Sequence, residues 1–331
     1  MFIPSCVDRM TRPFQWHLPN ARTAGVLLCV LSLLLLAGCA STPRISSPER
    51  LGIPQQASIA DVPFFGQRDY QCGPAALAMV LNDSGVEIGV DALIPQLFLP
   101  NRQGSVQPEM LATVRRQGRV PFVLDNDIES LLETLAADQP VVVMQNLSLP
   151  IAPLWHYAVA TGYDLDQETI RLHTGFKPNQ DMALSTFDAT WARSDRWAMV
   201  ALPPGEIPPG ISAQAALSAI SNAERVQGAV ELQPSWEALV ERWPGLAMGW
   251  FGLGNARYAS DDRAGAANAF RFATLHDPEL GAAWLNLGLT LHGLGEEQEA
   301  RTALEQAAAL PGKWRETAET KLAALFPKEA P

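Results

Sequence analysis

Residues 61–81 read DVPFFGQRDYQCGPAALAMVL, which is the clearest structural signal in the chain. From Pro74 onward the letters AALAMVL are strongly helix-forming, and proline suits the first turn of a helix. The pattern therefore predicts that Cys72 lies at the N-terminus of a helix, where the helix dipole favours a thiolate over a thiol. Before this helix we expect a polar loop over residues 67–71 and a short strand over residues 62–65.

A nucleophilic thiolate needs a base, and residues 61–205 contain two histidines. His156 lies in LWHYAVATGYD, a predicted strand, and His173 closes the return strand that we expect over residues 169–173. The alternation of a strand places His173 on the face opposite to the site, so we assign His156 as the base of Cys72. The alternatives are a satisfied core histidine and a buried structural cysteine, and the polar loop before Cys72 argues against the second.

The rest of this segment predicts an α/β arrangement. Residues 126–129 resemble a capping box and predict the start of a helix. Residues 140–144 and 196–202 are short apolar runs that predict buried strands. We expect Trp155 and Trp191 to pack in the core and not to bind a substrate.

The sequences QCGPAALAMVL and WHYAVATGYD together resemble the bacteriocin-processing (double-glycine) peptidase family and its non-exporter relatives, which are papain-like cysteine peptidases. The resemblance covers residues 61–205 and implies an α+β papain-like domain. In such proteins the cysteine opens the central helix, the histidine lies on a facing strand, and a preceding glutamine lines the oxyanion hole. The resemblance implies that Cys72 is the nucleophile, His156 the general base and Gln67 the oxyanion donor, with Gln71 as a weaker candidate for that last role.

The chain departs from this family pattern at the third catalytic position. The family usually has an aspartate on the strand after the histidine, and here Thr174 and Gly175 stand at the expected place. Threonine can accept a hydrogen bond from an imidazole, but it carries no charge and stabilises an imidazolium poorly. Either Thr174 orients His156, or another group does, or the site is weakened, so binding without catalysis stays open.

Residues 1–38 are typical of a secretory signal, because a basic segment precedes an apolar run that is short for a membrane span. The run ends in Leu36-Ala37-Gly38-Cys39, which resembles the lipobox of bacterial lipoproteins, and residues 39–60 are typical of a flexible tether. The alternative is an ordinary signal peptide with a chance cysteine. The lipobox, with Ala40 after the cysteine, implies an outer-membrane lipoprotein facing the periplasm. Cys72 is then the only free thiol in the mature chain.

An internal repeat with a period of 34 residues occupies the C-terminal part of the chain. Its signature positions recur from one copy to the next: Trp250, Leu253, Gly254, Ala266 and Ala273 return as Trp284, Leu287, Gly288, Ala300 and Ala307. This pattern resembles TPR repeats, in which small residues let two helices approach and large ones fill the space between hairpins. We expect a linker and first helix over residues 206–230, and an all-α TPR-type domain with a capping helix over residues 231–331. The alternative is an unrelated amphipathic bundle.

The net charge of the chain and its lack of metal-binding motifs limit the classes of function that we expect. The formal net charge of −11 excludes a protein built to follow phosphates, so we expect no nucleic-acid partner. No HExxH or CxxC motif is present, so we expect no metal and no cofactor. The expected function is hydrolysis of peptide bonds in a peptide or protein substrate, with a protein partner on the repeats and a membrane attachment through lipidated Cys39. The alternatives are a catalytically weak peptide-binding adaptor and a papain-like acyl transferase.

Overall fold

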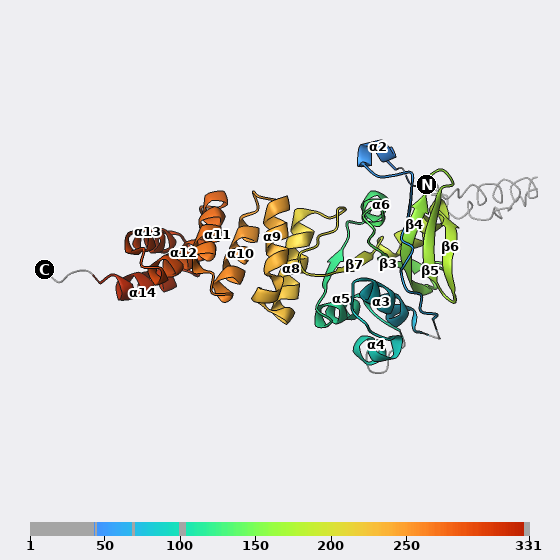
Figure 1. Ribbon diagram of the computed structural model, residues 1–331, viewed down its shortest axis with the longest axis horizontal. Helices are drawn as coiled ribbons and strands as arrows, with labels where there is room; N and C mark the ends of the chain where they lie inside the picture. The colour runs from blue at the N-terminus through green and yellow to red at the C-terminus, as the bar shows by residue number, and fades with distance from the viewer. Residues whose placement is uncertain (1–42, 44, 68–69, 99–103, 328–331) are drawn as a thin grey trace, which may run out of the picture. The chain divides into compact units, whose positions relative to one another are not determined.

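The computed structural model describes residue 43 and residues 45–67, 70–98 and 104–327. In this part of the chain an α+β domain comes first and a run of helices follows it (Figure 1). The helices and strands of the α+β domain are α2 (Pro48–Leu51), β1 (Gln56–Ser58), α3 (Cys72–Asp83), α4 (Val90–Leu97), α5 (Gln107–Arg116), β2 (Val120–Val123), α6 (Ile128–Ala136), β3 (Val141–Asn146), β4 (Trp155–Asp164), β5 (Thr169–Thr174), β6 (Lys177–Ala183), α7 (Leu184–Trp191), the short 3-10 helix η1 (Ala192–Ser194) and β7 (Ala198–Leu202).

These strands form one antiparallel sheet with the order β2-β7-β3-β4-β5-β6, and β1 pairs with the far end of β4. The sequences of β3 and β7 are nearly continuous apolar runs because both strands are buried in the middle of the sheet. Strand β4 pairs with β1, β3 and β5. Gly162 permits the contact with β1, since a Cβ atom there would collide with the carbonyl oxygen of Ala57.

Helix α3 packs against β3, β4 and β7, and every residue from position 73 to position 81 is buried. Its alanines are small, so the helix axis can approach the sheet closely. The helix expected after Pro74 is confirmed, and it begins at Cys72. Gly73 is required at this helix start because a Cβ atom there would collide with the side chain of Ser105.

The strand expected over residues 62–65 is wrong. Residues 62–65 do not pair with a neighbouring strand. The strand that precedes α3 is β1, which pairs with β4. Pro63 has no N–H to donate to a ladder, and the segment is held instead by a side chain. His173 is buried, accepts the Asn179 N–H at Nδ1 (3.2 Å) and donates from Nε2 to the Val62 carbonyl (3.2 Å).

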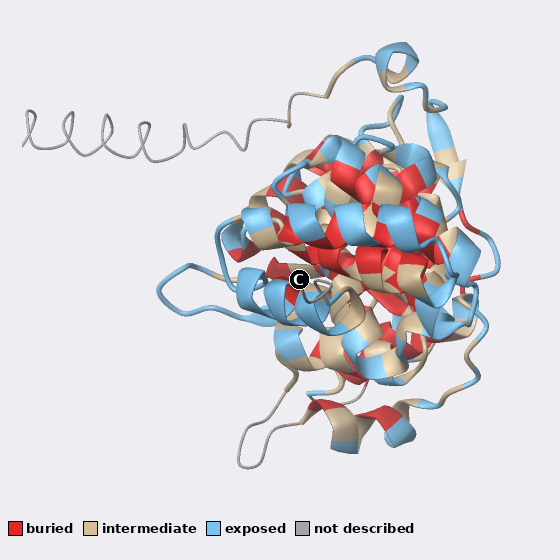
Figure 2. Cartoon of the chain, turned by 90° about the vertical axis from the view of Figure 1, so that its left-hand side faces the viewer, coloured by how far each residue is buried: buried red, intermediate tan, exposed pale blue. Residues whose placement is uncertain are grey.

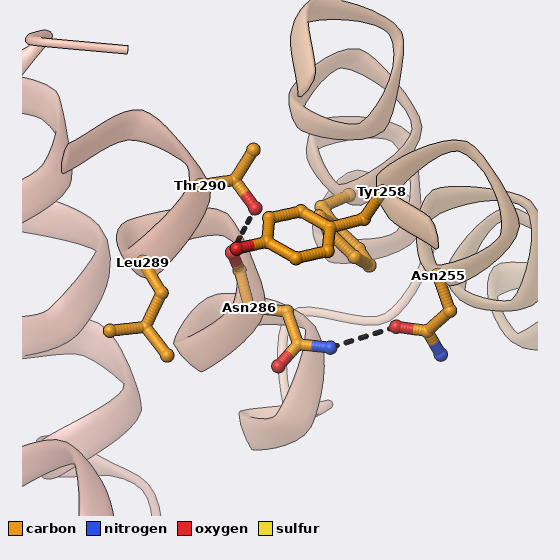
Figure 3. A pocket seen from close by; sticks show the side chains of 6 residues that line it. Asn255, Tyr258, Asn286, Leu289 and Thr290 are labelled. Carbon is orange, nitrogen blue, oxygen red and sulfur yellow. Dashed lines mark hydrogen bonds between the residues drawn. The ribbon is translucent and has the colours of Figure 1, made fainter. Parts of the chain in front are cut away.

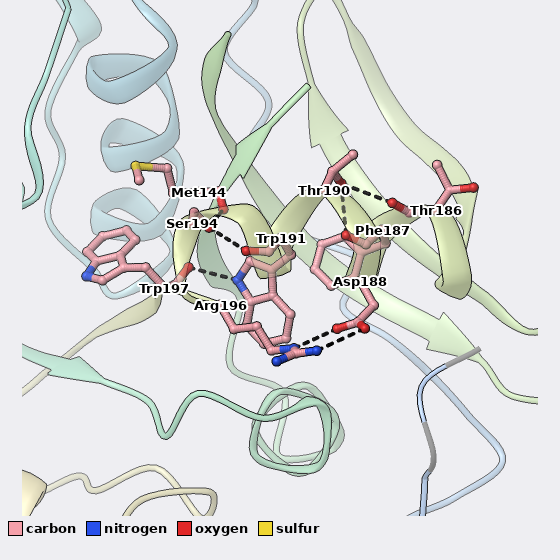
Figure 4. A network of polar contacts seen from close by, with 9 residues as sticks. All are labelled: Met144, Thr186, Phe187, Asp188, Thr190, Trp191, Ser194, Arg196 and Trp197. Carbon is pink, nitrogen blue, oxygen red and sulfur yellow. Dashed lines mark hydrogen bonds and ion pairs between the residues drawn. The ribbon is translucent and has the colours of Figure 1, made fainter. Parts of the chain in front are cut away.

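The helix predicted after residues 126–129 and the other predicted strands of this domain are confirmed, whereas residues 68 and 69 of the expected polar loop lie outside the described residues. Asp127 caps α6 by accepting the Ser130 N–H (2.7 Å), and the apolar runs form β3 and β7. A polar network joins α7, η1 and the ends of these strands (Figure 4). In it the indole N–H of Trp191 donates to the Trp197 carbonyl (2.9 Å), and Ser194 donates to the Met144 carbonyl. The network fixes the end of β3, from which the chain continues toward His156.

The helical part of the chain consists of consecutive antiparallel hairpins, each packed on the next. Gly254 and Gly288 bring paired helices together, because a Cβ atom at either would collide with Phe270 or Leu304. Each 34-residue period corresponds to one pair of helices, as predicted, and the TPR-type domain is confirmed. Its helices are α8 (Ala213–Gln227), α9 (Ala229–Arg242), α10 (Ala247–Ala259), α11 (Arg263–His276), α12 (Gly281–Gly293), α13 (Glu297–Ala309) and α14 (Arg315–Leu325).

One apolar core extends from the sheet into the first repeat helices. Phe122 of β2 and Ile220 of α8 belong to the same buried cluster, and α8 packs on β2 and α5. At the edge of this contact the Gln227 amide donates to the Arg119 carbonyl (2.9 Å). Figure 2 shows buried residues gathered inside and exposed residues on the outer surface. None of the helices in the described ranges is long and apolar enough to cross a bilayer.

Candidate active site

Cys72 opens α3 and is partly buried. It forms no disulfide, and the Ala75 N–H closes the first helical turn on the Gln71 carbonyl (3.0 Å). The first turn contains no acidic residue and has no side-chain cap, so nothing in it opposes the positive end of the helix dipole. Cys72 therefore lies at the helix N-terminus that the sequence predicted for it.

His156 is the second residue of β4 and lies opposite Gln145 of β3. Its Nε2 atom lies 2.7 Å from Thr174 Oγ1, within hydrogen-bond distance. When Nε2 carries the proton it donates to the threonine hydroxyl, and Nδ1 keeps a lone pair that can accept a proton from a thiol. Burial lowers the pKa of His156, so the ring is neutral at neutral pH.

Gln67 connects the strand of His156 to the strand of Thr174. Its side-chain amide donates to the Tyr157 carbonyl (3.3 Å), and its backbone N–H donates to the Gly175 carbonyl (3.1 Å). The residue is 6% exposed. An amide carries two N–H groups, so the contact with Tyr157 leaves one for another acceptor. Gln67, His156 and Thr174, which are far apart in sequence, therefore gather at one place.

Helix α3 and strand β4 are neighbours in the fold. The two elements pack together, and Cys72 packs against the apolar cluster to which Tyr157 belongs. Burial raises the pKa of Tyr157, and the negative charge of Cys72 raises it further. Helix α3, which Cys72 opens, therefore packs on the strand that carries His156. Gln71 caps the helix through its backbone, and His173 makes the structural contacts described above.

An exposed apolar loop leads into His156. Residues 147–154 follow β3, contain no charged residue, and end at Trp155. Ile151 is 90% exposed, and Phe176, two residues after Thr174, is 77% exposed. Trp191 is fully buried as predicted, whereas the packing role predicted for Trp155 is wrong, because its side chain is half exposed.

Polar contacts hold this apolar loop in shape. The Asn146 side chain accepts the N–H groups of Ser148 (3.0 Å) and Leu154 (2.9 Å). Arg193 donates to the carbonyls of Asn146 (3.1 Å) and Ser148 (3.0 Å). The loop is therefore a preformed apolar surface beside the site. The uncharged sequence LSLPIAPL is the signal that could have predicted this surface.

The repeats contain a separate pocket of about 180 Å³ between α10 and α12 (Figure 3). The Asn286 amide donates to the Asn255 side-chain oxygen (2.9 Å), and Tyr258 lies beside them. This pocket offers amide groups and an aromatic ring, and the side chains that line it include no charged one.

The described residues contain no cluster of three or more histidine, cysteine or acidic side chains that could hold a metal ion. Cys39, the predicted lipidation site, lies outside the described residues.

Comparison with known proteins finds a family model and solved structures that are similar to the first domain. Residues 59–199 match the model of the Peptidase_C39 like family. A putative C39-like peptidase from Bacillus anthracis is 17% identical, with 44% of this chain and 97% of that chain covered and a TM-score of 0.38. A double glycine motif protease from an AMS/PCAT transporter, solved in complex with the leader peptide, is 17% identical over 44% of this chain and 94% of that chain, with a TM-score of 0.34.

The Yersinia enterocolitica type III secretion translocator chaperone SycD is 18% identical over 37% of this chain and 95% of that chain, with a TM-score of 0.33. No curated protein matches the sequence. The family model rests on the segment that contains Cys72 and His156, and the repeats show the 34-residue packing described above. Residues 59–199 thus form a domain of the C39-like peptidase family, and TPR-like helical repeats follow it.

Proposed function

We propose that the protein is a cysteine peptidase, and the observation that carries the proposal is the Gln67–His156–Thr174 cluster beside the helix that Cys72 opens. His156 Nδ1 takes the proton of the Cys72 thiol, and the sulfur attacks the carbonyl carbon of a peptide bond. The free N–H of the Gln67 side chain and the backbone N–H of Cys72 hold the resulting oxyanion. The imidazolium then gives its proton to the leaving amine, and water hydrolyses the thioester.

Thr174 determines how the His156 imidazole is supported in this mechanism. A hydroxyl orients the imidazole but adds no negative charge, and burial already lowers the pKa of His156. His156 is therefore neutral while Cys72 carries its proton, and transfer of that proton to His156 gives the thiolate–imidazolium pair that attacks the substrate.

The substrate is a polypeptide that places apolar side chains against the loop of residues 147–154 and Phe176. These exposed apolar groups adjoin the two strands that carry His156 and Thr174, so an extended peptide at the site would cover them. The repeats bind a protein partner or a second part of the substrate, and the pocket between α10 and α12 supports this role.

The protein acts at the cell envelope, anchored through acylated Cys39 to the outer membrane and facing the periplasm. The lipobox-like sequence at residues 36–39 supports this part of the proposal. Growth with a labelled fatty acid tests it. Label in the full-length protein that is lost in Cys39→Ala supports the anchor, and equal label in both proteins contradicts it.

The decisive experiment measures the alkylation rate of Cys72 against pH in the full chain in detergent, by mass spectrometry of the peptide that contains it. We expect a rate midpoint below that of an ordinary thiol, about pH 8.5, and an upward shift of the midpoint in His156→Ala. Peptide-library cleavage that is absent in Cys72→Ser then identifies the reaction. An ordinary thiol profile that does not respond to His156→Ala would overturn the peptidase proposal.

An adaptor without catalysis is the second candidate, and the uncharged Thr174 favours it. The two functions differ in cells. If Cys72→Ala leaves the cellular role intact at equal protein levels, the repeats carry the function and the peptidase proposal fails. If that variant loses the role, the adaptor fails.

A further inference from the structure

Exposed apolar side chains gather around the candidate active site. The loop of residues 147–154, the residue that follows it and the turn between β5 and β6 carry six of them. We call these six the apolar rim: Leu147, Leu149, Ile151, Leu154, Trp155 and Phe176. The hydrogen bond between His156 and Thr174 holds the end of the loop close to that turn. An apolar patch of this kind marks a contact with another molecule or with a membrane.

The loop of residues 147–154 leaves few backbone donors for a partner. Pro150 and Pro153 have no N–H, and four other N–H groups are bonded within the loop or to the Asn146 side chain. The bonded groups are those of Leu147, Ser148, Ala152 and Leu154. An extended peptide is held by backbone hydrogen bonds, which this loop offers sparingly. A lipid surface, by contrast, requires that backbone donors be satisfied within the protein, and the loop comes close to that condition.

Two positively charged side chains adjoin the apolar rim. No aspartate, glutamate, lysine or arginine occurs from residue 139 to residue 163. Lys177 directly follows Phe176 and is exposed, and the exposed Arg193 donates to two carbonyls at the base of the loop. The chain as a whole has a net charge of −11, so the sign of these two charges is opposite to the average. Positive side chains beside an apolar surface are complementary to a bilayer with anionic headgroups.

We propose that the apolar rim inserts into the surface of an anionic lipid bilayer, with Leu149 and Ile151 among the acyl chains and Lys177 at the headgroups. The inference rests on the proposed membrane location and goes beyond it, because a lipid anchor alone does not orient the domain. Trp155, next to His156, lies at the interface, where tryptophan is favoured. The site then opens at the membrane surface. Its substrate is a polypeptide that lies on that surface, whose apolar side chains reach the apolar rim without leaving the lipid.

A fluorescent probe at position 151 tests the proposal in the full chain, reconstituted into vesicles of phosphatidylethanolamine and phosphatidylglycerol. Ile151→Cys combined with Cys72→Ser carries an environment-sensitive dye, and Cys72→Ser alone gives the signal from dye on any other cysteine. We expect the emission at position 151 to move to shorter wavelength and to be quenched by spin-labelled lipids. Label near the headgroups should quench more than label at the chain ends, since interfacial side chains lie about 5–10 Å deep. The matched control is Leu275→Cys with Cys72→Ser, because Leu275 is an exposed apolar side chain of the repeats and should stay unquenched.

The outcomes separate this inference from the proposed function. In vesicle-bound protein, an unquenched probe at position 151, or equal quenching at positions 151 and 275, overturns the insertion. A shift to shorter wavelength without lipid quenching also overturns it, since a second copy of the chain or another protein surface would then cover the apolar rim. Every variant contains Cys72→Ser, so the result does not depend on the peptidase chemistry, which the alkylation of Cys72 tests. If the protein does not bind vesicles, the membrane location and this inference fall while the peptidase proposal stands.

Discussion

At the scale of single residues, the candidate site contains a histidine that contacts a hydroxyl at the place where the sequence resemblance implies a carboxylate. His156 Nε2 and Thr174 Oγ1 are 2.7 Å apart, so the ring is oriented, but no described carboxylate raises the pKa of His156. Thr174 thus orients the His156 ring without stabilising the positive charge of an imidazolium. The two effects can therefore be tested separately.

We expect the acid limb of the pH profile of kcat/KM to lie below pH 6.5, the ordinary pKa of histidine. Burial lowers the pKa of His156, so the ring stays neutral and able to accept a proton until the pH falls below that value. The measurement is peptide hydrolysis against pH with the substrate identified by library cleavage. An acid limb above pH 6.5 would contradict a burial-controlled base.

Thr174→Asp adds a negative charge beside His156 that no carboxylate among the described residues supplies. A carboxylate beside Nε2 should raise the pKa of His156 by about one unit or more, which moves the acid limb of kcat/KM upward by the same amount. Thr174→Val is the matched control, because it keeps the shape and removes the acceptor. We expect it to lower kcat about tenfold or more with a smaller change in the limb. An unmoved limb in Thr174→Asp would show that position 174 does not contact the base in solution.

At the scale of elements, the loop of residues 147–154 is a rigid apolar surface and not a loose connection. Asn146 and Arg193 satisfy its backbone groups, which leaves the apolar side chains outside. Such exposure costs solubility, and a contact with an apolar substrate would offset that cost.

Ile151→Asp should raise KM about tenfold and leave kcat nearly unchanged. The side chain is 90% exposed, so the substitution hardly affects folding but removes apolar contact that the substrate would cover. Leu275→Asp, which changes an exposed apolar residue in the repeats, is the control for a general effect of charge. If kcat falls and KM does not change, the loop acts on the chemistry and not on binding.

At the scale of the whole molecule, the described part of the chain shares a core across the boundary between the α+β domain and the repeats. Ile220 of α8 is fully buried in the cluster that contains Phe122 of β2. An arrangement of this kind couples the folding of the first repeat helix to that of the sheet, since neither surface is covered without the other.

Ile220→Asp should lower the free energy of unfolding by about 3 kcal/mol or more, because it buries a carboxylate without a partner. Val226→Asp, at an exposed position of the same helix, should change it by less than about 0.5 kcal/mol. Denaturant unfolding followed by tryptophan fluorescence measures both. A single transition that moves to lower denaturant in Ile220→Asp supports a shared core, and an unmoved sheet transition contradicts it.

Local pattern was enough to predict several parts of this protein. The helix that begins at Cys72, the strands on both sides of the turn after His156, and the 34-residue repeats all follow from periodicity, capping and turn chemistry within short stretches of chain. The candidate residues Cys72, His156, Gln67 and Thr174 came from spacing and resemblance, and their catalytic roles stay predictions. Residues 62–65 failed as a strand because Pro63 has no N–H to donate to a ladder, and the Val62 carbonyl accepts from the distant side chain of His173 instead.

Tertiary structure alone decided which groups meet and which stay unpaired. Tyr157 and Tyr163 belong to one strand and are equally exposed, yet among the described residues only the Tyr163 hydroxyl has a hydrogen-bond partner, the Pro54 carbonyl. The sequence also did not predict that Trp155 is half exposed, or that Ile220 and Phe122 share one core. The physical reason is that secondary structure reflects interactions between near neighbours in the chain, whereas burial and hydrogen-bond pairing depend on segments that only the folded chain brings together.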